Sequence, residues 1–253
     1  MTDTLSSLDA FNALNAFNAK GFALVRDALN SARWADWSPP TLRAGAVGGS
    51  RCLLDQPAVV DMALALREHP TLRTLIPDGH VAVQCTYFEK SSDRNWLVPI
   101  HQDLSIPVAR RVEVPDERGW RGWSEKEGTT FVQAPVEVLE QLVAVRWHLD
   151  PCGEQDGPLR VVPGSHRSGV QSPQQAIETR ERLGEAVCTA NVGDALVLRP
   201  LALHASSKST GTSRRRVLHV VFGPARLPDG LSWAIAVPSR GQGEQPSQRT
   251  HAA

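Results

Sequence analysis

The first 79 residues place their apolar positions mostly at helical spacing. Apolar residues recur every third position before Gly21, which predicts a helix over residues 9–20. A second helix is predicted from Pro57, because proline favours the first turn of a helix, and Pro70 interrupts its pattern. The short stretch "FALVRDAL" between the two is typical of a strand. We therefore expect an N-terminal helical part over residues 1–79.

After Gly79 the pattern changes to that of β-strands. Stretches rich in β-branched and aromatic residues follow one another, separated by Gly, Pro and Asp turns: "HVAVQCTYFEK", "QLVAVRWHLD", "LRVVPGSH", "DALVLRPLALHAS" and "RRVLHVVFGPA". No helices alternate with these strands, which indicates an antiparallel barrel or jelly roll. The expected fold class is mainly β with flanking helices, with the β core over residues 80–237.

Two segments depart from this pattern. Residues 109–135 are rich in charge, Gly and Trp, and they are too long for a simple turn, so we expect an insert that acts as a lid or binding loop. Residues 238–253 are polar and poor in apolar residues, which predicts a disordered tail. The rest of the chain, residues 1–237, is expected to form a single domain.

Charge and composition exclude several kinds of partner. The 27 basic and 27 acidic residues balance, and no run of Lys or Arg is dense enough to bind a string of phosphates, so we expect no nucleic-acid partner. No stretch reaches the roughly 18 apolar residues of a membrane span, and the N-terminus lacks the order of a signal peptide. A soluble, cytoplasmic protein is expected, with no membrane partner and an oligomeric state that the sequence leaves open. The four cysteines are scattered without a C-x-x-C and are expected to be reduced.

The stretch "PIHQDLSIPV" contains the first candidate for chemistry. In an extended chain His101 and Asp103 point to the same side, so both can reach one ion while Gln102 faces away. Two histidines and one carboxylate suit non-haem Fe(II) and leave coordination positions open. His204 is the best-placed third ligand, because it ends the predicted strand "ALVLRPLALH" and a strand end lies at the mouth of a barrel. On its own, H-x-D is more often a surface polar pair than a metal site.

The other histidines of the β region fit structural roles better. His148 and His219 lie in the middle of predicted strands and are expected to be packed or hydrogen-bonded, and His166 is expected to fix a turn.

The sequence around these residues resembles the phytanoyl-CoA dioxygenase family of Fe(II)- and 2-oxoglutarate-dependent oxygenases. Three stretches carry the resemblance, in the family's order and separation: "NWLVPIHQD", "CGEQDGPLRVVPGSHRSG" and "VGDALVLRPLALHASSKSTGTSRRRVLHVVF". The resemblance implies a double-stranded β-helix (jelly roll, cupin-like). It also implies that His101, Asp103 and His204 bind Fe(II), with no catalytic residue beyond these ligands, and that 2-oxoglutarate and O2 are the co-substrates.

The same resemblance assigns two residues to the co-substrate. The family places an arginine eleven residues after the distal histidine to hold the distal carboxylate of 2-oxoglutarate, and Arg215 occupies that position. The hydroxyl two residues after the histidine, which in relatives helps to bind the same carboxylate, corresponds to Ser206. Arg214 and Arg216 flank the candidate, but neighbours in a strand point to the opposite face. The alternative is that all three arginines form a solvated basic patch.

The function implied is hydroxylation of an unactivated C–H bond of a small molecule, with release of succinate and CO2. A substrate that is amino-acid-like or a secondary metabolite is expected. The same cofactors also serve desaturation, cyclisation and other oxidative tailoring. A zinc hydrolase that uses the same three ligands and a non-catalytic metal-binding β-helix protein are the alternatives from other classes. Several further residues are candidates for the pocket but are equally compatible with packing or solvent exposure: Lys90, Trp96, Trp120, Trp123 and Arg160.

Overall fold

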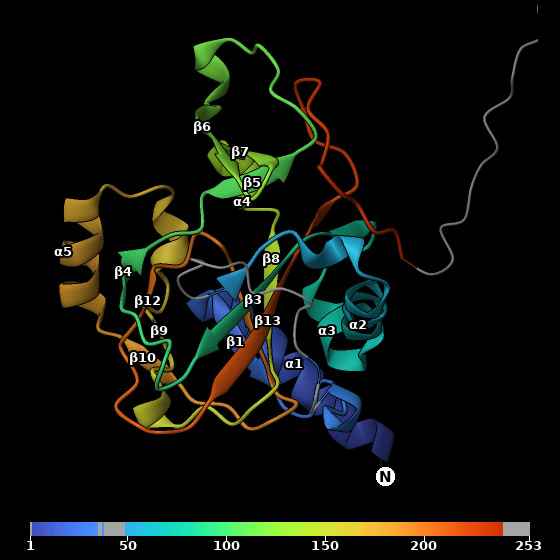
Figure 1. Cartoon of the computed structure of the whole chain (residues 1–253), viewed down its shortest axis with the longest axis vertical. Coiled ribbons are helices and arrows are strands. Elements are labelled where there is room, and N and C mark those ends of the chain that lie inside the picture. The colour runs from blue at the N-terminus through green and yellow to red at the C-terminus, as the bar shows by residue number, and fades with distance from the viewer. Residues whose placement is uncertain (1, 35–36, 38–48, 240–253) are drawn as a thin grey trace, which may run out of the picture.

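The part of the chain that the structure describes forms three antiparallel β-sheets with helices packed on the outside (Figure 1). The structure is a computed structural model that describes residues 2–34, 37 and 49–239. The two larger sheets enclose one cavity, which is the arrangement of a double-stranded β-helix and confirms the expected fold class. Within the described part, no helix combines the length and apolar character that a membrane crossing requires. Most of the tail predicted to be disordered, residues 240–253, lies outside the described residues.

The largest sheet contains six strands and forms one wall of the cavity. In order across the sheet they are β1 (Phe22–Val25), β11 (Ala195–Leu198), β8 (Val143–His148), β13 (Arg215–Pro224), β3 (His80–Lys90) and β2 (Gly49–Ser50). The central strands β8 and β13 are buried along almost their whole length, because helices cover one face of the sheet and the second sheet faces the other. Their apolar, β-branched sequences suit this double burial.

The four-stranded and three-stranded sheets form the rest of the cavity wall. The four-stranded sheet has the order β10 (Ala186–Cys188), β9 (Leu159–Val161), β12 (His204–Ser206) and β4 (Val98–His101). The three-stranded sheet has the order β5 (Ser105–Val108), β7 (Thr129–Gln133) and β6 (Arg121–Lys126). Residues 109–135, expected to be an insert, thus contain two strands that extend from β5. Their action as a lid stays a prediction.

The helices pack around the large sheet and beside the four-stranded one. They are α1 (Thr2–Lys20), α2 (Pro57–Glu68), α3 (Pro70–Leu75), α4 (Val136–Leu139) and α5 (Pro173–Leu183). Short 3₁₀ turns lie at Ala32–Trp34, Leu53–Asp55, Asp116–Arg118, Glu154–Asp156 and Ser165–Ser168. Phe17 from α1 and Met62 from α2 pack in one cluster with Trp147 and Phe222 from the outer face of the large sheet, and all four are at most 2% exposed. Full burial of each such side chain stabilises the fold by about 1.5–3 kcal/mol.

The N-terminal part is less purely helical than expected. β1 follows α1 directly and pairs with β11 at one edge of the large sheet, while β2 pairs with β3 at the other edge. The strand-like stretch after Gly21 therefore belongs to the β core, although it lies within residues 1–79.

The predicted strand "ALVLRPLALH" is in fact two strands in different sheets. β11 ends at Leu198, and residues 199–203 form a turn before β12 begins at His204. Pro200 has no N–H to donate to a ladder, so a strand cannot continue through it in mid-sheet. The expectation that His204 ends a strand is wrong, because His204 is the first residue of the next strand.

β13 presents successive arginines to opposite faces of its sheet. Arg215 lies on the cavity side. Arg216 lies on the other side, where its Nε and Nη2 donate to the two Asp150 carboxylate oxygens at 2.8 Å each and its Nη1 donates to the Trp37 carbonyl. Since the Arg216 side chain is only 4% exposed, the Asp150 carboxylate is the anion that balances this buried guanidinium.

We predict that Asp150→Ala lowers the free energy of unfolding by about 3–5 kcal/mol, because it leaves the Arg216 guanidinium buried without its anion. Urea denaturation followed by circular dichroism measures this change. Asp78→Ala is the matched control, because its side chain is fully exposed and its contact with Arg67 is long at 3.9 Å. A loss below about 1 kcal/mol, typical of a surface pair, would show that the Asp150 pair does not stabilise the sheet.

Candidate metal centre

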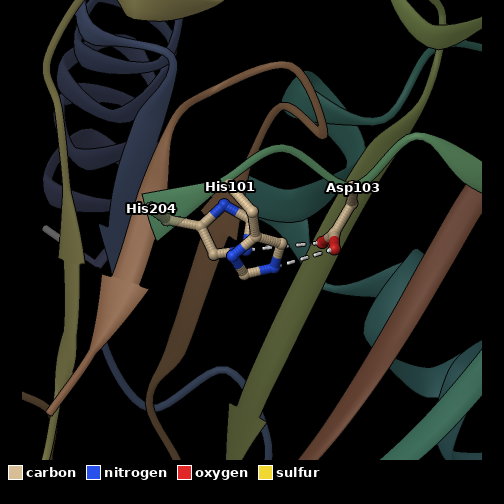
Figure 2. Close-up of side chains that lie close together, drawn as sticks. All are labelled: His101, Asp103 and His204. Carbon is tan, nitrogen blue, oxygen red and sulfur yellow. Dashed lines mark ion pairs between the residues drawn. The ribbon is translucent and has the colours of Figure 1, made fainter. Parts of the chain in front are cut away.

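Two strand termini bring two histidines and one aspartate together (Figure 2). β12 pairs with β4 so that His204, its first residue, lies opposite His101, the last residue of β4. Asp103 follows two residues after His101. Its carboxylate lies 3.5 Å from Nε2 of His101 and 3.6 Å from Nε2 of His204. Among the described residues these three form the one group of His, Cys, Asp or Glu that could hold a metal ion, with ligand atoms within 4.8 Å of one another.

Both imidazoles are oriented by backbone carbonyls. Nδ1 of His101 lies 2.9 Å from the Pro99 oxygen, and Nδ1 of His204 lies 2.9 Å from the Ala202 oxygen. A carbonyl only accepts, so Nδ1 carries a proton in each ring, and in the neutral ring Nε2 keeps its lone pair. Both lone pairs are therefore directed to the space beside Asp103. This arrangement fits the way protein histidines bind metals.

The charges at this centre also suit a cation. Burial alone would raise the pKa of the Asp103 carboxyl, but His204 and His101 outweigh burial and hold that pKa well below its ordinary range. Burial lowers the pKa of His204 to about 4, which leaves this imidazole neutral at pH 7. A carboxylate and two imidazoles with free Nε2 atoms form the donor set that suits Fe(II) and leaves coordination positions for other ligands.

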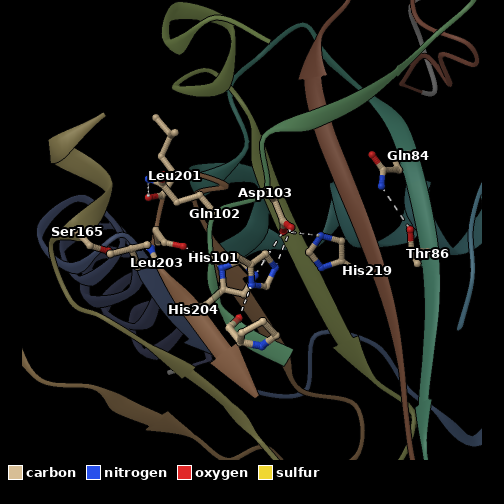
Figure 3. A network of polar contacts seen from close by, with 12 residues as sticks. Gln84, Thr86, His101, Gln102, Asp103, Ser165, Leu201, Leu203, His204 and His219 are labelled. Atoms are coloured by element: carbon tan, nitrogen blue, oxygen red, sulfur yellow. Dashed lines mark hydrogen bonds and ion pairs between the residues drawn. The ribbon is translucent and has the colours of Figure 1, made fainter. Parts of the chain in front are cut away.

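Hydrogen bonds fix the H-x-D segment to the turn at residues 199–203 (Figure 3). The Asp103 N–H donates to the Pro200 carbonyl at 3.0 Å. Gln102 points away from the ligands, as expected, and its amide donates to the Leu201 carbonyl at 2.7 Å. On the other side of the turn, the Ser165 hydroxyl accepts the Leu203 N–H at 2.9 Å. The "PGSH" stretch therefore positions the backbone just before His204, a role that sequence reasoning did not assign.

His219 lies closer to the centre than the sequence suggested. It was expected to be a packed histidine, and it is buried, but its Nε2 is 3.9 Å from the Asp103 carboxylate (Figure 3). Burial and the nearby Arg146 lower its pKa to about 3, so its ring is neutral. Its position on the inner face of β13 follows from its spacing of four residues from Arg215, and this is the signal that could have found it.

A cavity of about 400 Å³ opens beside the three residues. Arg215 and Ser206 both line it, and both donate to the Gly157 carbonyl, at 2.6 Å from Nη1 of Arg215 and 2.9 Å from the Ser206 hydroxyl. Arg214 is exposed and Arg216 lies on the opposite face of the sheet. The register of β13 thus brings Arg215 to the cavity. Its role in binding a co-substrate stays a prediction.

Lys90 joins Arg215 and Ser206 at the same end of the cavity. It lies opposite Arg215 in the β13–β3 ladder, and its ammonium donates to the Ser206 hydroxyl at 2.6 Å and to the Ser207 carbonyl. Burial, followed by the charge of Arg215, lowers its pKa to about 7. Gly157 must stay small here, since its φ is +63° and a Cβ would lie 2.5 Å from the Ser207 oxygen.

The remaining pocket candidates divide into two groups. Trp96 lines the cavity, and the Lys90 ammonium lies 5.4 Å from its ring centre. Trp120 instead packs in the core and donates to Asp229, Trp123 lies against Arg111, and Arg160 pairs with Glu185. Sequence reasoning missed Arg146, which also lines the cavity.

The chain matches the model of one protein family and is similar in fold to several solved structures. The model of the family described as phytanoyl-CoA dioxygenase (PhyH) matches residues 17–217 of the chain. No curated protein matches significantly.

Several solved structures share the fold. EctD from S. alaskensis in its apo form is 16% identical with a TM-score of 0.62, over 85% of this chain and 76% of that chain. SnoN, a non-haem α-ketoglutarate-dependent epimerase of nogalamycin biosynthesis, is 14% identical with a TM-score of 0.59, over 94% of this chain and 90% of that one. HygX from Streptomyces hygroscopicus, with nickel and 2-oxoglutarate bound, is 15% identical with a TM-score of 0.56, over 84% of this chain and 86% of that one. At these identities the likeness shows a common fold.

We predict that His101→Ala or His204→Ala reduces bound iron from stoichiometric to near zero, because each change removes one of three donors. Elemental analysis after anaerobic loading measures the metal, and circular dichroism checks that the sheets remain folded. His69→Ala, at the junction of α2 and α3, is the matched control and should load normally. Unchanged iron in either variant would remove that histidine from the centre.

Proposed function

The chain belongs to the phytanoyl-CoA dioxygenase family, and from that premise we propose that His101, Asp103 and His204 hold the Fe(II) of a 2-oxoglutarate-dependent dioxygenase. The single observation that carries the proposal is the convergence of these side chains from two paired strand ends, with both histidine Nε2 atoms directed at Asp103. When bound, the iron would activate O2 at the expense of the oxidative decarboxylation of 2-oxoglutarate.

The far end of the cavity supports 2-oxoglutarate as the co-substrate. A dicarboxylate that binds the metal through one end needs a positive partner for its other end. Arg215 supplies a guanidinium, Ser206 a hydroxyl and Lys90 an ammonium at one place on the cavity wall. Arginine's planar fork suits a carboxylate, and the low exposure of this site strengthens the pairing.

The reaction proposed is hydroxylation of an unactivated C–H bond in a small molecule, amino-acid-like or a secondary metabolite, with release of succinate and CO2. Apolar side chains form much of the remaining cavity wall, and they would keep water from the substrate carbon: Ile106, Phe131, Leu142 and Val221. Desaturation, ring formation or other oxidative tailoring by the same cofactors is the second candidate; the fold is shared with the epimerase SnoN, so it also serves reactions other than hydroxylation.

Alternatives from other classes leave part of this site without a role. A hydrolase needs the three metal ligands and an open position, but it has no use for a buried arginine and lysine at the far end of the cavity. A non-catalytic binding protein would need neither the open coordination positions nor their access to the cavity.

The proposal predicts that the iron-loaded protein releases succinate from 2-oxoglutarate in air, and that Arg215→Gln raises the apparent 2-oxoglutarate constant. Loss of a buried charge pair costs about 2–5 kcal/mol. We therefore expect a rise of about 30-fold or more. Succinate formation at varied 2-oxoglutarate concentrations, with ascorbate present, measures both effects.

Arg214→Gln is the matched control for this experiment, since it removes the same charge from the exposed neighbouring position. It should leave the constant near that of the parent. The reverse result, with a large effect at Arg214 and none at Arg215, would contradict the assignment. Absence of any succinate from the iron-loaded parent would contradict the proposed function itself.

A further inference from the structure

The cavity beside the metal centre is strongly positive. Its lining includes five cationic side chains and one carboxylate, that of Asp103: Arg51, Lys90, Lys126, Arg146 and Arg215. The chain as a whole carries 27 basic and 27 acidic residues. The excess of positive charge is therefore a property of the cavity, and it indicates that the bound molecules are anionic.

Most of these cations already have partners in the protein. Arg51 pairs with Glu127, Lys90 donates to Ser206, and Arg215 donates to Gly157. Lys126 lies over the Phe131 ring at 4.9 Å.

Arg146 differs from the other four cations in its contacts. It is only 7% exposed, and within the described part of the chain its guanidinium makes no hydrogen bond or ion pair. Its protein contact is the face of the Phe88 ring, 5.1 Å from the guanidinium carbon. Burial, followed by the charge of Arg215, lowers the pKa of Arg146 to about 10, so it stays charged at neutral pH. A buried charge without a partner is costly, which makes such a residue a binding site for an anion.

The register of the sheet places Arg146 apart from the 2-oxoglutarate end of the cavity. Arg146 lies on β8 directly opposite His219 on β13, and His219 lies against Asp103. Arg215 is four residues further along β13, a separation of about 13 Å between the two backbone positions. The backbone of Arg146 therefore lies level with the metal centre, while the backbone of Arg215 lies at the far end of the cavity.

The charges of the proposed cofactors do not neutralise this cavity. Fe(II), the Asp103 carboxylate and a 2-oxoglutarate dianion together carry one net negative charge, which balances one cation, that of Arg215. Of the other cations, Arg51 pairs with Glu127, and Lys90, whose pKa burial lowers to about 7, donates to Ser206. The charges of Arg146 and Lys126 remain without a balancing anion. This step rests on the proposed function.

We propose that the primary substrate is an organic acid, and that Arg146 binds its carboxylate beside the metal centre. The planar guanidinium pairs with a carboxylate through two parallel hydrogen bonds and so fixes orientation as well as position. The apolar walls formed by Leu142 and Val221 would receive the hydrocarbon part that is oxidised. Arg146 is thus a specificity-determining residue, and Lys126 from β6 adds positive charge to the same cavity.

Calorimetric titration of the Ni(II)- and 2-oxoglutarate-loaded protein tests this proposal without turnover. Two pairs of probes differ only in charge: hexanoate with hexanamide, and cyclohexanecarboxylate with its primary amide. We expect each acid to bind at least about tenfold more tightly than its amide, a difference of about 1.4 kcal/mol. Arg146→Gln should abolish that preference, and Arg146→Lys should retain part of it.

Separate titration of 2-oxoglutarate into the Ni(II)-loaded variants shows whether Arg146 binds the carboxylate of the primary substrate or that of 2-oxoglutarate. Arg146→Gln should leave the 2-oxoglutarate affinity within about threefold of the parent, a change below 1 kcal/mol. The exposed Arg214→Gln is the charge-matched control and should change neither affinity.

Equal binding of acids and amides by the parent protein would overturn the proposal, whether or not the variants fold. An Arg146→Gln loss of 2-oxoglutarate affinity as large as that for the acids would overturn it too, by assigning Arg146 to the co-substrate. Failure of 2-oxoglutarate to bind the Ni(II)-loaded parent would instead contradict the proposed function.

Discussion

The pairing of β12 with β4 is the constraint on which the site depends. It places His204 opposite His101, and the chain then needs only two further residues to bring Asp103 to the same point. This pairing requires the chain to leave the large sheet after Leu198 and to enter the four-stranded sheet at His204. The turn between them is held by its own contacts with the ligand segment, through Gln102 and the Asp103 N–H. The three proposed metal ligands and the crossing between sheets thus form one hydrogen-bonded unit.

Burial of charge is the second organising feature, and the alternation of β13 controls it. Arg216 faces the helical side and is neutralised there by Asp150, so it contributes to the fold. Arg215 faces the cavity, where its Nη1 donates to the neutral Gly157 carbonyl. Arg146 on the neighbouring strand has no such contact within the described residues. The protein carries the cost of these buried cations in the cavity, and bound anions would offset it.

Much of this arrangement could be predicted from the sequence, because its signals are local. Strand-forming stretches predicted the β core, the H-x-D spacing predicted that the side chains of His101 and Asp103 lie on one side, and alternation along a strand separated Arg215 from Arg216. The break between β11 and β12 was missed because an apolar run such as "ALVLRPLALH" looks the same whether it stays in one sheet or crosses to another. Arg146 was missed because its place opposite His219 depends on the register between β8 and β13, which pairs these two residues although they lie 73 positions apart in the sequence. The spacing of four residues from Arg215 places His219 on the cavity face of β13, but its distance from Asp103 depends on how separate parts of the chain pack together.

The central claim is that one Fe(II) site forms between the ends of β4 and β12, with 2-oxoglutarate extending from it to Arg215. Anomalous diffraction from crystals grown without oxygen, with Fe(II) and 2-oxoglutarate, tests this most directly. A single strong iron peak is expected within coordination distance of Nε2 of His101, Nε2 of His204 and an Asp103 carboxylate oxygen. Density is also expected for a dicarboxylate whose far end meets the Arg215 guanidinium. An iron peak elsewhere, or a dicarboxylate whose far end lies away from Arg215, would contradict the central claim.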